Sequence, residues 1–332
     1  MEMVKGRSLW QDAMARFFHN KAAVTSLVLL SIIVLFSFVG PYFAVWSNEE
    51  IDWSRLGKAA ELGAPSFTNG HFFGIDNLGR DLYSRVIQGT QISLMVGIIG
   101  AMIAVGVGTL YGAVAGYFGG RVDSAMMRIV DILMSIPYMF ILILLLVVFG
   151  RSIVMLFVGI GLISWLGMAR IVRGQTMSIK NKEFVEAAVA TGVPSFTIIV
   201  RHIVPNLMGV VVVYATLLVP EMILTESFIS FLGLGVQEPN TSWGALISNG
   251  AGTMQYGTIW QLAIPLAFFV VALFSFFFIG DGLRDVFDPR GTTLSRSRFQ
   301  RRLQQLHDRH QPPQVVGQGN QVKAITSDRP SD

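Results

Sequence analysis

Cysteine is absent from this sequence, and charged residues make up only 14% of its 332 residues. The absence of cysteine excludes disulfide bonds, cysteine-ligated zinc and a thiol nucleophile. The five histidines are scattered without a metal-ligand spacing, and the sequence contains no G-x-x-x-x-G-K-S/T phosphate-binding loop. Because soluble domains carry about 25% charged residues, this composition excludes a soluble enzyme, a disulfide scaffold and a disordered chain.

Long uncharged segments are the dominant feature of what is present. They cover residues 22–48, 86–120, 132–150, 152–169, 202–220 and 239–280. A helix that crosses a bilayer needs about 20 apolar residues, so each segment is long enough to span or nearly so. The sequence therefore predicts an all-α polytopic membrane protein with six transmembrane helices, at about 22–46, 93–118, 136–150, 153–168, 209–230 and 259–280. Residues 233–257 are rich in Gly, Asn, Ser and Thr and are expected to form a surface or re-entrant loop.

The distribution of lysine and arginine predicts the orientation. The segments on one side of the membrane, 1–21, 119–135, 169–208 and 281–332, hold 20 of the 25 basic residues, and the segments on the other side hold 5. Basic residues accumulate in cytoplasmic segments, so both termini are predicted to be cytoplasmic. The net charge of +4 does not indicate a nucleic-acid partner, because the basic residues lie between and beyond the apolar segments.

This topology predicts an organisation of the chain into successive segments. A cytoplasmic N-terminal segment (1–21) is followed by the first transmembrane helix (22–46), which is too long for a cleavable signal core. A periplasmic loop (47–92), a five-helix core (93–280) with a cytoplasmic loop (169–208), and a cytoplasmic, partly disordered tail (281–332) complete the chain. Arginines of the tail either contact anionic lipid or lie in a solvated tail without a role; these are Arg296, Arg298, Arg301 and Arg302.

A row of small residues predicts close helix packing on the second helix. Glycine or alanine recurs every four residues from Gly100 to Gly120 and includes Gly108, Gly112 and Gly116. Residues at this spacing share one helix face, and small side chains allow helix backbones to approach closely in lipid. The face either packs within the chain or forms a subunit interface.

The cytoplasmic loop 169–208 has the pattern of a helix, a turn and a second helix. Gly192 follows a helix-forming stretch and suits the left-handed conformation of a helix C-terminus. Pro194 then stops the helix, Ser195 is expected to cap a short helix to about Arg201, and Pro205 precedes the fifth span. Such a compact projection fits the groove of a partner.

The residues of this loop resemble a known family. Glu186-Ala187-Ala188, then Gly192 and Ile203-Val204-Pro205, resemble the EAA loop of ATP-binding cassette importer permeases, although Val204 stands where that family more often has leucine. Four further segments resemble the peptide/nickel branch, namely 73–85, 123–137, 227–235 and 280–289. The start Gly6-Arg-Ser-Leu-Trp-Gln-Asp and the loop after Val236 favour its C-type oligopeptide subunits.

The resemblance implies a type I ABC importer permease of the bacterial inner membrane that forms half of the translocation pathway. Its implied partners are a homologous B-type permease, two ABC ATPases that bind ATP and Mg²⁺, a periplasmic peptide-binding protein and membrane lipid. The chain itself is then no enzyme and binds no cofactor or metal. The alternatives are a permease for dipeptides or nickel, and a stand-alone secondary transporter.

The resemblance also implies roles for the residues of the loop. Ala187, Ala188 and Gly192 would seat the loop in a cleft of the ATPase, with Pro205 closing the motif, and Glu186 would orient the loop through an ion pair. A helix-stabilising surface charge is the simpler interpretation of Glu186.

The fifth span carries two carboxylates, Glu221 and Glu226. Carboxylates at membrane depth are costly and rarely face lipid, so these two are expected to face the pathway, the partner permease or a neighbouring helix. They need not share a face, because five residues correspond to about 140° of rotation. Two shorter spacings, Asp81 with Arg85 and Arg128 with Asp131, predict structural ion pairs.

Overall fold

The structure, a computed structural model, describes residues 9–287. The interpretations of the tail arginines concern residues beyond this range and lie outside the described part of the chain. The described residues form helices joined by loops, with two isolated β-bridges and no extended strand, which confirms the all-α class. The helices are α1 (Leu9–His19), α2 (Lys21–Val39), α3 (Ala59–Leu62), α4 (Leu82–Phe118), α5 (Gly120–Ser135), α6 (Tyr138–Phe149), α7 (Ile153–Ile179), α8 (Glu183–Ala190), α9 (Ser195–Ile198), α10 (Val204–Phe231), α11 (Trp243–Thr253) and α12 (Trp260–Phe287).

Five stretches of helix are long and apolar enough to cross a membrane. They are Lys21–Phe43, Leu82–Phe118, Ile153–Ile179, Ser195–Phe231 and Trp260–Val286. The third predicted span is different, because α5 and α6 meet at an angle of 78°. Pro137 lies at this break, and the residue before a proline is disfavoured in the α-helical conformation. The predicted count of six is confirmed when this bent pair is counted as one span.

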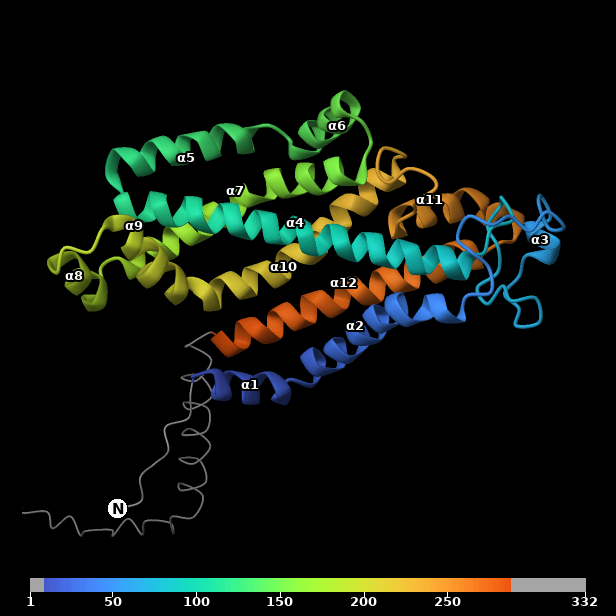
Figure 1. Cartoon of the computed structure of the whole chain (residues 1–332), viewed down its shortest axis with the longest axis horizontal. Coiled ribbons are helices and arrows are strands. Elements are labelled where there is room, and N and C mark those ends of the chain that lie inside the picture. Colours follow the sequence, from blue (N-terminus) through green and yellow to red (C-terminus); the bar gives the residue numbers. More distant parts are fainter. Residues whose placement is uncertain (1–8, 288–332) are drawn as a thin grey trace, which may run out of the picture. The chain divides into compact units, whose positions relative to one another are not determined.

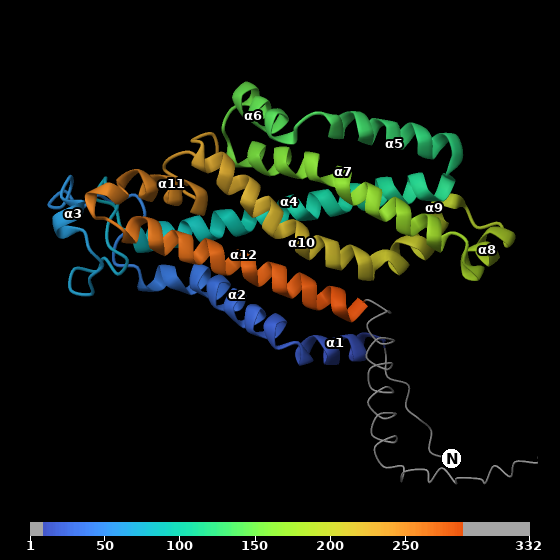
Figure 2. The ribbon, with the colours of Figure 1, turned by 180° about the vertical axis from the view of Figure 1, so that it is seen from behind.

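The helices form a bundle around α4. In both Figure 1 and Figure 2, α7 and α10 lie along α4, while α12 lies between α10 and α2. Helices α8 and α9 occupy one end of the bundle together with α1 and the C-terminal end of α12 (Figure 1). Helices α3 and α11 occupy the opposite end. We call these the inner end and the outer end, since the charge pattern predicts the first to be cytoplasmic.

Helices α4 and α7 extend well beyond the apolar segments that predicted them. Helix α4 begins at Leu82 rather than at residue 93, and α7 continues past residue 168 to Ile179. In α4 the Asp81 carboxylate accepts a hydrogen bond from the Ser84 N–H at 2.8 Å and so caps the helix. The segment 233–257, predicted as a loop, contains the helix α11, whose Trp243 is fully buried.

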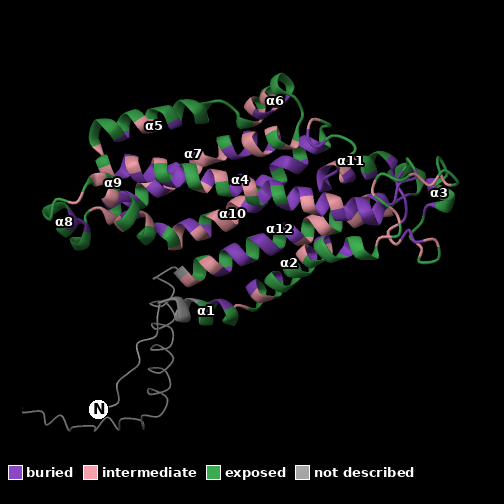
Figure 3. Cartoon of the chain, in the orientation of Figure 1, coloured by how far each residue is buried: buried purple, intermediate pink, exposed green. Residues whose placement is uncertain are grey.

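The row of small residues on α4 packs against α7. A Cβ atom at Gly108 would lie 2.6 Å from the Met168 Cβ, and one at Gly116 would lie 2.7 Å from the Arg173 carbonyl oxygen. Gly112 lies between them against the backbone of α7. Figure 3 shows the buried residues concentrated along α4, whereas α5 and α6 are largely exposed. These three glycines therefore lie against a helix of the same chain, as the first of the two predicted interpretations has it.

Candidate functional site

Helix α8 is fixed to the inner end of the bundle by its apolar side. Val185 and Ala188 are buried, with exposed fractions of 1% and 7%, in one cluster with Ile198 and Ile203. The same cluster includes residues of α4, α7 and α10, namely Ala113, Met168, Val172, Leu207 and Val211. A short helix is not stable alone in water, so this packing is what makes α8 a rigid projection.

The end of α8 has the geometry of a Schellman motif. Gly192 has φ +78°, its N–H donates to the Val189 carbonyl at 3.0 Å, and the Val193 N–H donates to the Ala188 carbonyl at 3.1 Å. This motif needs a left-handed residue, which is usually glycine. The predicted role of Gly192 as a helix C-terminus is therefore confirmed. Ser195 is instead the first residue of α9 and makes no capping hydrogen bond, so its predicted capping role is wrong.

The outward face of the loop combines charge with large apolar side chains. Glu186, Ala187 and Gly192 are exposed, and a Cβ atom at Gly192 would meet nothing within 4 Å. Within residues 9–287, Glu186 forms no ion pair. Ala188 is buried against its own chain, so it cannot lie on the same outward surface as Ala187.

Sequence reasoning missed three apolar residues of this surface, Phe184, Val189 and Phe196. They are 42%, 54% and 72% exposed. Their presence in a charged loop could have identified them from the sequence. Large apolar side chains that remain exposed mark an interaction site. We call these three residues with Glu186, Ala187 and Gly192 the inner docking surface.

Pro205 lies in an unbroken helix rather than in a connector. Helices α9 and α10 are joined by one π-helical turn, Ile199–Ile203, and the whole run Ser195–Phe231 continues as one helix. Proline has no N–H to donate to the carbonyl four residues earlier and clashes with that carbonyl in a regular α-helix. The wider turn just before Pro205 suits this requirement.

Glu226 is enclosed at the junction of α4, α10 and α11. It is 0% exposed and accepts hydrogen bonds from the hydroxyls of Ser230 at 2.6 Å, Ser93 at 3.0 Å and Ser227 at 3.3 Å. Ser93 also accepts the Trp243 N–H of α11. The surroundings of Glu226 are those of a polar contact between helices, because serine hydroxyls of α4 and α10 enclose its carboxylate.

Glu221 has different surroundings in the same helix. It lines a cavity of about 510 Å³ between α10, α7 and the junction of α5 with α6. The side chain is exposed, and no hydrogen bond or ion pair within the described part of the chain reaches its carboxylate. The two carboxylates of the fifth span thus differ in their surroundings: Glu226 is enclosed between helices, and Glu221 lines a cavity.

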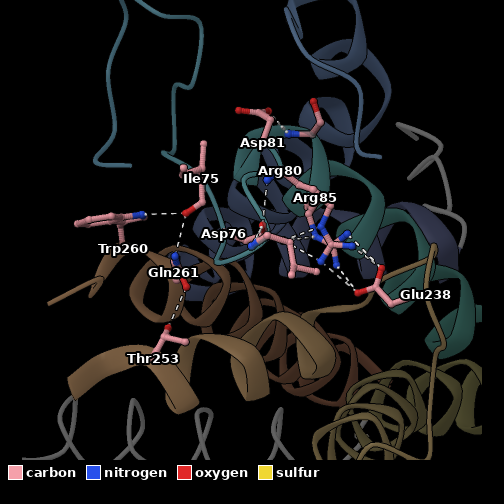
Figure 4. A network of polar contacts seen from close by, with 11 residues as sticks. Ile75, Asp76, Arg80, Asp81, Arg85, Glu238, Thr253, Trp260 and Gln261 are labelled. Atoms are coloured by element: carbon pink, nitrogen blue, oxygen red, sulfur yellow. Dashed lines mark hydrogen bonds and ion pairs between the residues drawn. The ribbon is translucent and has the colours of Figure 1, made fainter. Parts of the chain in front are cut away.

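A second polar cluster holds the outer end together (Figure 4). The Glu238 carboxylate, between α10 and α11, bridges two guanidinium groups, with Arg80 at 2.6 Å and Arg85 at 3.1 Å. Asp76 contacts Arg80 at 2.8 Å from the other side. Arg85 is only 1% exposed, and a buried charge needs such partners. The cluster therefore joins the loop before α4 to the loop before α11.

His71 of the outer loop lies between two carboxylates. The His71 Nδ1 lies 2.9 Å from Asp81, and its Nε2 lies 3.5 Å from Asp52. Burial raises the pKa of the Asp81 carboxyl, despite the hydrogen bonds from Ser84 and His71. The predicted pair of Asp81 with Arg85 is wrong, because each residue has another partner.

At the inner end the predicted pair of Arg128 with Asp131 is also wrong. Asp131 pairs with Arg170 at 2.5 Å, and Asp123 pairs with Arg173 at 2.5 Å. Both ion pairs join α5 to α7, since each carboxylate lies on α5 and each arginine lies on α7.

Replacing Glu238 by glutamine is expected to weaken the outer cluster in a pH-dependent way. Burial alone would raise the pKa of Glu238, but the hydrogen bonds and charges of Arg80 and Arg85 outweigh burial and lower it. The stabilising contribution is therefore complete above the ordinary value of 4.5 and is lost as the pH falls through the lowered value. Because the side chain is 53% exposed, we expect a loss of roughly 1 kcal/mol or less at neutral pH.

The measurement is the thermal unfolding midpoint of both proteins in detergent between roughly pH 7 and pH 3, a range that covers carboxyl titration. The difference between wild type and Glu238→Gln should shrink as the pH falls. A difference that is constant over the whole range would contradict the assigned role of the charge.

Comparison with known proteins shows the family of this chain. Residues 108–292 match the family described as "Binding-protein-dependent transport system inner membrane component", and residues 8–60 match "N-terminal TM domain of oligopeptide transport permease C". The oligopeptide transport system permease protein OppC of Haemophilus influenzae is 55% identical over 287 residues, which cover 86% of this chain and 90% of that protein. The chain belongs to the binding-protein-dependent permease family.

Further relatives of this permease have related names. The OppC protein of Escherichia coli is 57% identical over 86% of this chain and 93% of its own length. The dipeptide transport system permease protein DppC of Bacillus subtilis is 41% identical over 85% of this chain and 86% of its own length. Among solved structures, the inward-facing MetNI methionine ABC transporter matches 61% of this chain and 96% of its own, at 18% identity and a TM-score of 0.49.

These findings confirm the resemblance to the peptide/nickel importer permeases. They also confirm a location in the inner membrane, which agrees with the apolar helices of the permease. Family membership favours a subunit of a multi-protein importer over a stand-alone secondary transporter.

Proposed function

We propose that this permease forms half of the translocation pathway of an ATP-driven oligopeptide importer. The names of two relatives that are 55% and 57% identical support oligopeptides over dipeptides or nickel as the cargo. A homologous B-type permease would supply the other half of the pathway, and a periplasmic peptide-binding protein would deliver the peptide. Two ABC ATPases would bind and hydrolyse ATP with Mg²⁺, and this chain would catalyse no reaction itself.

The observation that carries the proposal is the inner docking surface on a rigid support. Phe184, Val189 and Phe196 expose apolar area beside the free carboxylate of Glu186. Apolar anchors with a charged neighbour are the composition of a protein-binding surface, and the ATPases are the partners expected on the cytoplasmic side. Glu186 would orient the loop by an ion pair with an ATPase side chain, while Ala187 and Gly192 would leave room for close approach.

The connection from this surface to the pathway is a single helix. The run Ser195–Phe231 begins beside α8 and contains Glu221. Val185 and Ala188 of α8 are buried against the first turns of this run. When ATP binds one state of the ATPase pair more tightly than the other, that difference can drive the permeases between their own states. We infer that α8 transmits this movement because a packed helix moves as a rigid element.

Purification of this chain from solubilised membranes tests the assembly. We expect a second permease and two ABC ATPases to remain bound, as identified by mass spectrometry. A stable assembly of this chain alone that still transports peptide would contradict the proposal.

Replacing Gly192 by tryptophan tests the inner docking surface. We expect the rate of peptide uptake to fall about 10-fold while membrane insertion stays normal. Small residues allow close approach, and the tryptophan side chain would instead stand between the loop and the ATPase. Strain at the positive φ is a separate effect, which Gly192→Asn controls, since asparagine tolerates this conformation. Gly257→Trp is the matched control at the outer end, where φ is +83° and a Cβ also meets nothing within 4 Å. Equal losses for Gly192→Trp and Gly257→Trp would rule out the docking role.

A further inference from the structure

The two carboxylates of α10 provide an internal comparison. Glu226 has three hydroxyl donors and no exposed surface, whereas Glu221 has no partner within residues 9–287. Both lie in the same membrane-spanning helix, where an ionisable group is costly and marks a functional site. The requirement for a partner is met at Glu226 and unmet at Glu221.

The cavity beside Glu221 has the properties of a ligand site. Its volume of about 510 Å³ lies within the range of roughly 300–1,000 Å³ that is typical of ligand pockets. The walls are mostly apolar and carry a few polar groups, Tyr138, Ser164, Tyr214 and Thr225. Such a combination of an apolar lining and a few polar groups orients a ligand without enclosing it.

Charge decides what kind of ligand this cavity accepts. Glu221 is the only charged residue in the lining, and no lysine, arginine or histidine accompanies it. A carboxylate in an apolar cavity is stabilised by a cation and repels an anion. The rings of Tyr138 and Tyr214 in the same lining offer faces that also attract cations.

A cation that pairs with Glu221 would come from outside the described part of this chain, because no lysine, arginine or histidine lies in the lining. A free peptide carries an α-amino group with a pKa of about 7.7–8.0, so most molecules are protonated at neutral pH. We propose that Glu221 binds the α-ammonium group of the peptide as it crosses the membrane. This inference rests on the proposed function, and it makes Glu221 a specificity-determining residue for cargo with a free amino terminus.

A single carboxylate also suits transport better than a site with several charged residues, because it would bind the peptide less tightly. Cargo must be bound well enough to enter and weakly enough to leave. Glu221 offers one ion pair on a mostly apolar surface, and the described lining holds no second charged residue. The location between α10, α7 and the bent α5–α6 junction places this contact among three elements whose relative movement would release the cargo.

Carbodiimide cross-linking during uptake tests the contact directly. A membrane-permeant carbodiimide converts a carboxylate into an O-acylisourea ester. An amine in contact with this ester attacks its carbonyl carbon, which forms an amide and releases the carbodiimide as a urea. The complete importer is reconstituted in vesicles with ATP and an isotope-labelled tetrapeptide. We expect mass spectrometry to find the amino-terminal nitrogen of the peptide joined to Glu221 and not to Glu226. The adduct should be absent for Glu221→Gln and for the N-acetylated peptide.

Uptake measurements separate failure of the inference from failure of the proposed function. We expect Glu221→Gln to lower the uptake rate about 10-fold, the loss typical of one charge-assisted hydrogen bond, while the complex still assembles. Wild-type uptake without an adduct at Glu221, or normal uptake by Glu221→Gln, would overturn the inference and leave the importer proposal intact. Cross-linking of Glu221 to a lysine of the partner permease would overturn it too. An assembled wild-type complex that takes up no peptide would instead contradict the proposed function.

Discussion

Replacing Gly112 by leucine is expected to eliminate most of the folded permease. A Cβ atom at this position would lie 2.9 Å from both the Arg173 backbone nitrogen and the Val172 Cβ, and closer still to the Ala169 carbonyl oxygen. Two of these three atoms belong to the backbone of α7, so a change of rotamer cannot make room. Overpacking in a well-packed interior costs about 1–3 kcal/mol and occasionally more, and we expect the upper end because α4 and α7 would have to separate.

The loss should extend beyond the contact itself. Helix α7 carries Arg170 and Arg173, which hold α5, and Met168 and Val172, which support α8. Displacing α7 therefore disturbs the inner docking surface as well. The measurement is the yield of monodisperse protein after size-exclusion chromatography in detergent, together with its thermal unfolding midpoint.

Gly106→Leu is the matched control for this substitution. Gly106 lies in the same helix, is exposed, and a Cβ there would meet nothing within 4 Å. We expect Gly106→Leu to retain the yield and the unfolding midpoint of the wild type. Similar losses for both variants would show that helix propensity or hydrophobicity, rather than contact with α7, determines the effect.

The small-residue face of α4 shows what a local sequence pattern can and cannot predict. The four-residue spacing of Gly108, Gly112 and Gly116 predicts a close contact because the spacing alone places them on one face. It contains no information about the helix on the other side. That partner depends on which helices the topology brings together, so α7 became known only from the structure.

The loop around α8 likewise has one feature that the sequence predicts and one that it does not. The turn at Gly192 is predictable because it depends on residues within one helical turn. The burial of Ala188 is not, because it depends on Ile198, Ile199 and Ile203, which fold back onto α8. The family resemblance grouped Ala187 and Ala188 as one element, although only Ala187 faces outward.

Charged residues explain the errors in helix boundaries and in ion pairing. Arg85 and Arg170 bound uncharged segments in the sequence but lie inside α4 and α7, where carboxylates from other elements pair with them. Arg80 and Glu238 are separated by 158 positions. A pattern of i,i+3 and i,i+4 spacings cannot reveal such partners, so the predicted local pairs were wrong.

Glu226→Leu is expected to destabilise the permease and Glu221→Leu is not, although the two positions lie in one helix. At position 226 the substitution leaves the hydroxyls of Ser93, Ser227 and Ser230 without their acceptor in a buried site. An unsatisfied buried polar group costs about 1–3 kcal/mol. Some hydroxyls can turn to a carbonyl of their own helix, so we expect a total loss of about 2–4 kcal/mol.

At position 221 the same change removes, from the interior of a membrane span, a carboxylate that has no partner among residues 9–287. Insertion scales assign such a charge a cost of about 2.5–3.5 kcal/mol, so Glu221→Leu should leave the unfolding midpoint of the isolated chain unchanged or raise it. Glu226→Gln is the conservative control, because an amide oxygen still accepts from the serines and hydroxyls can also accept from the amide N–H.

The measurement is the thermal unfolding midpoint in detergent of the wild type and of the three variants. Equal destabilisation by the two leucine variants would show that the role of each carboxylate is set by its depth in the membrane and not by its partners, which would remove the structural distinction between Glu221 and Glu226.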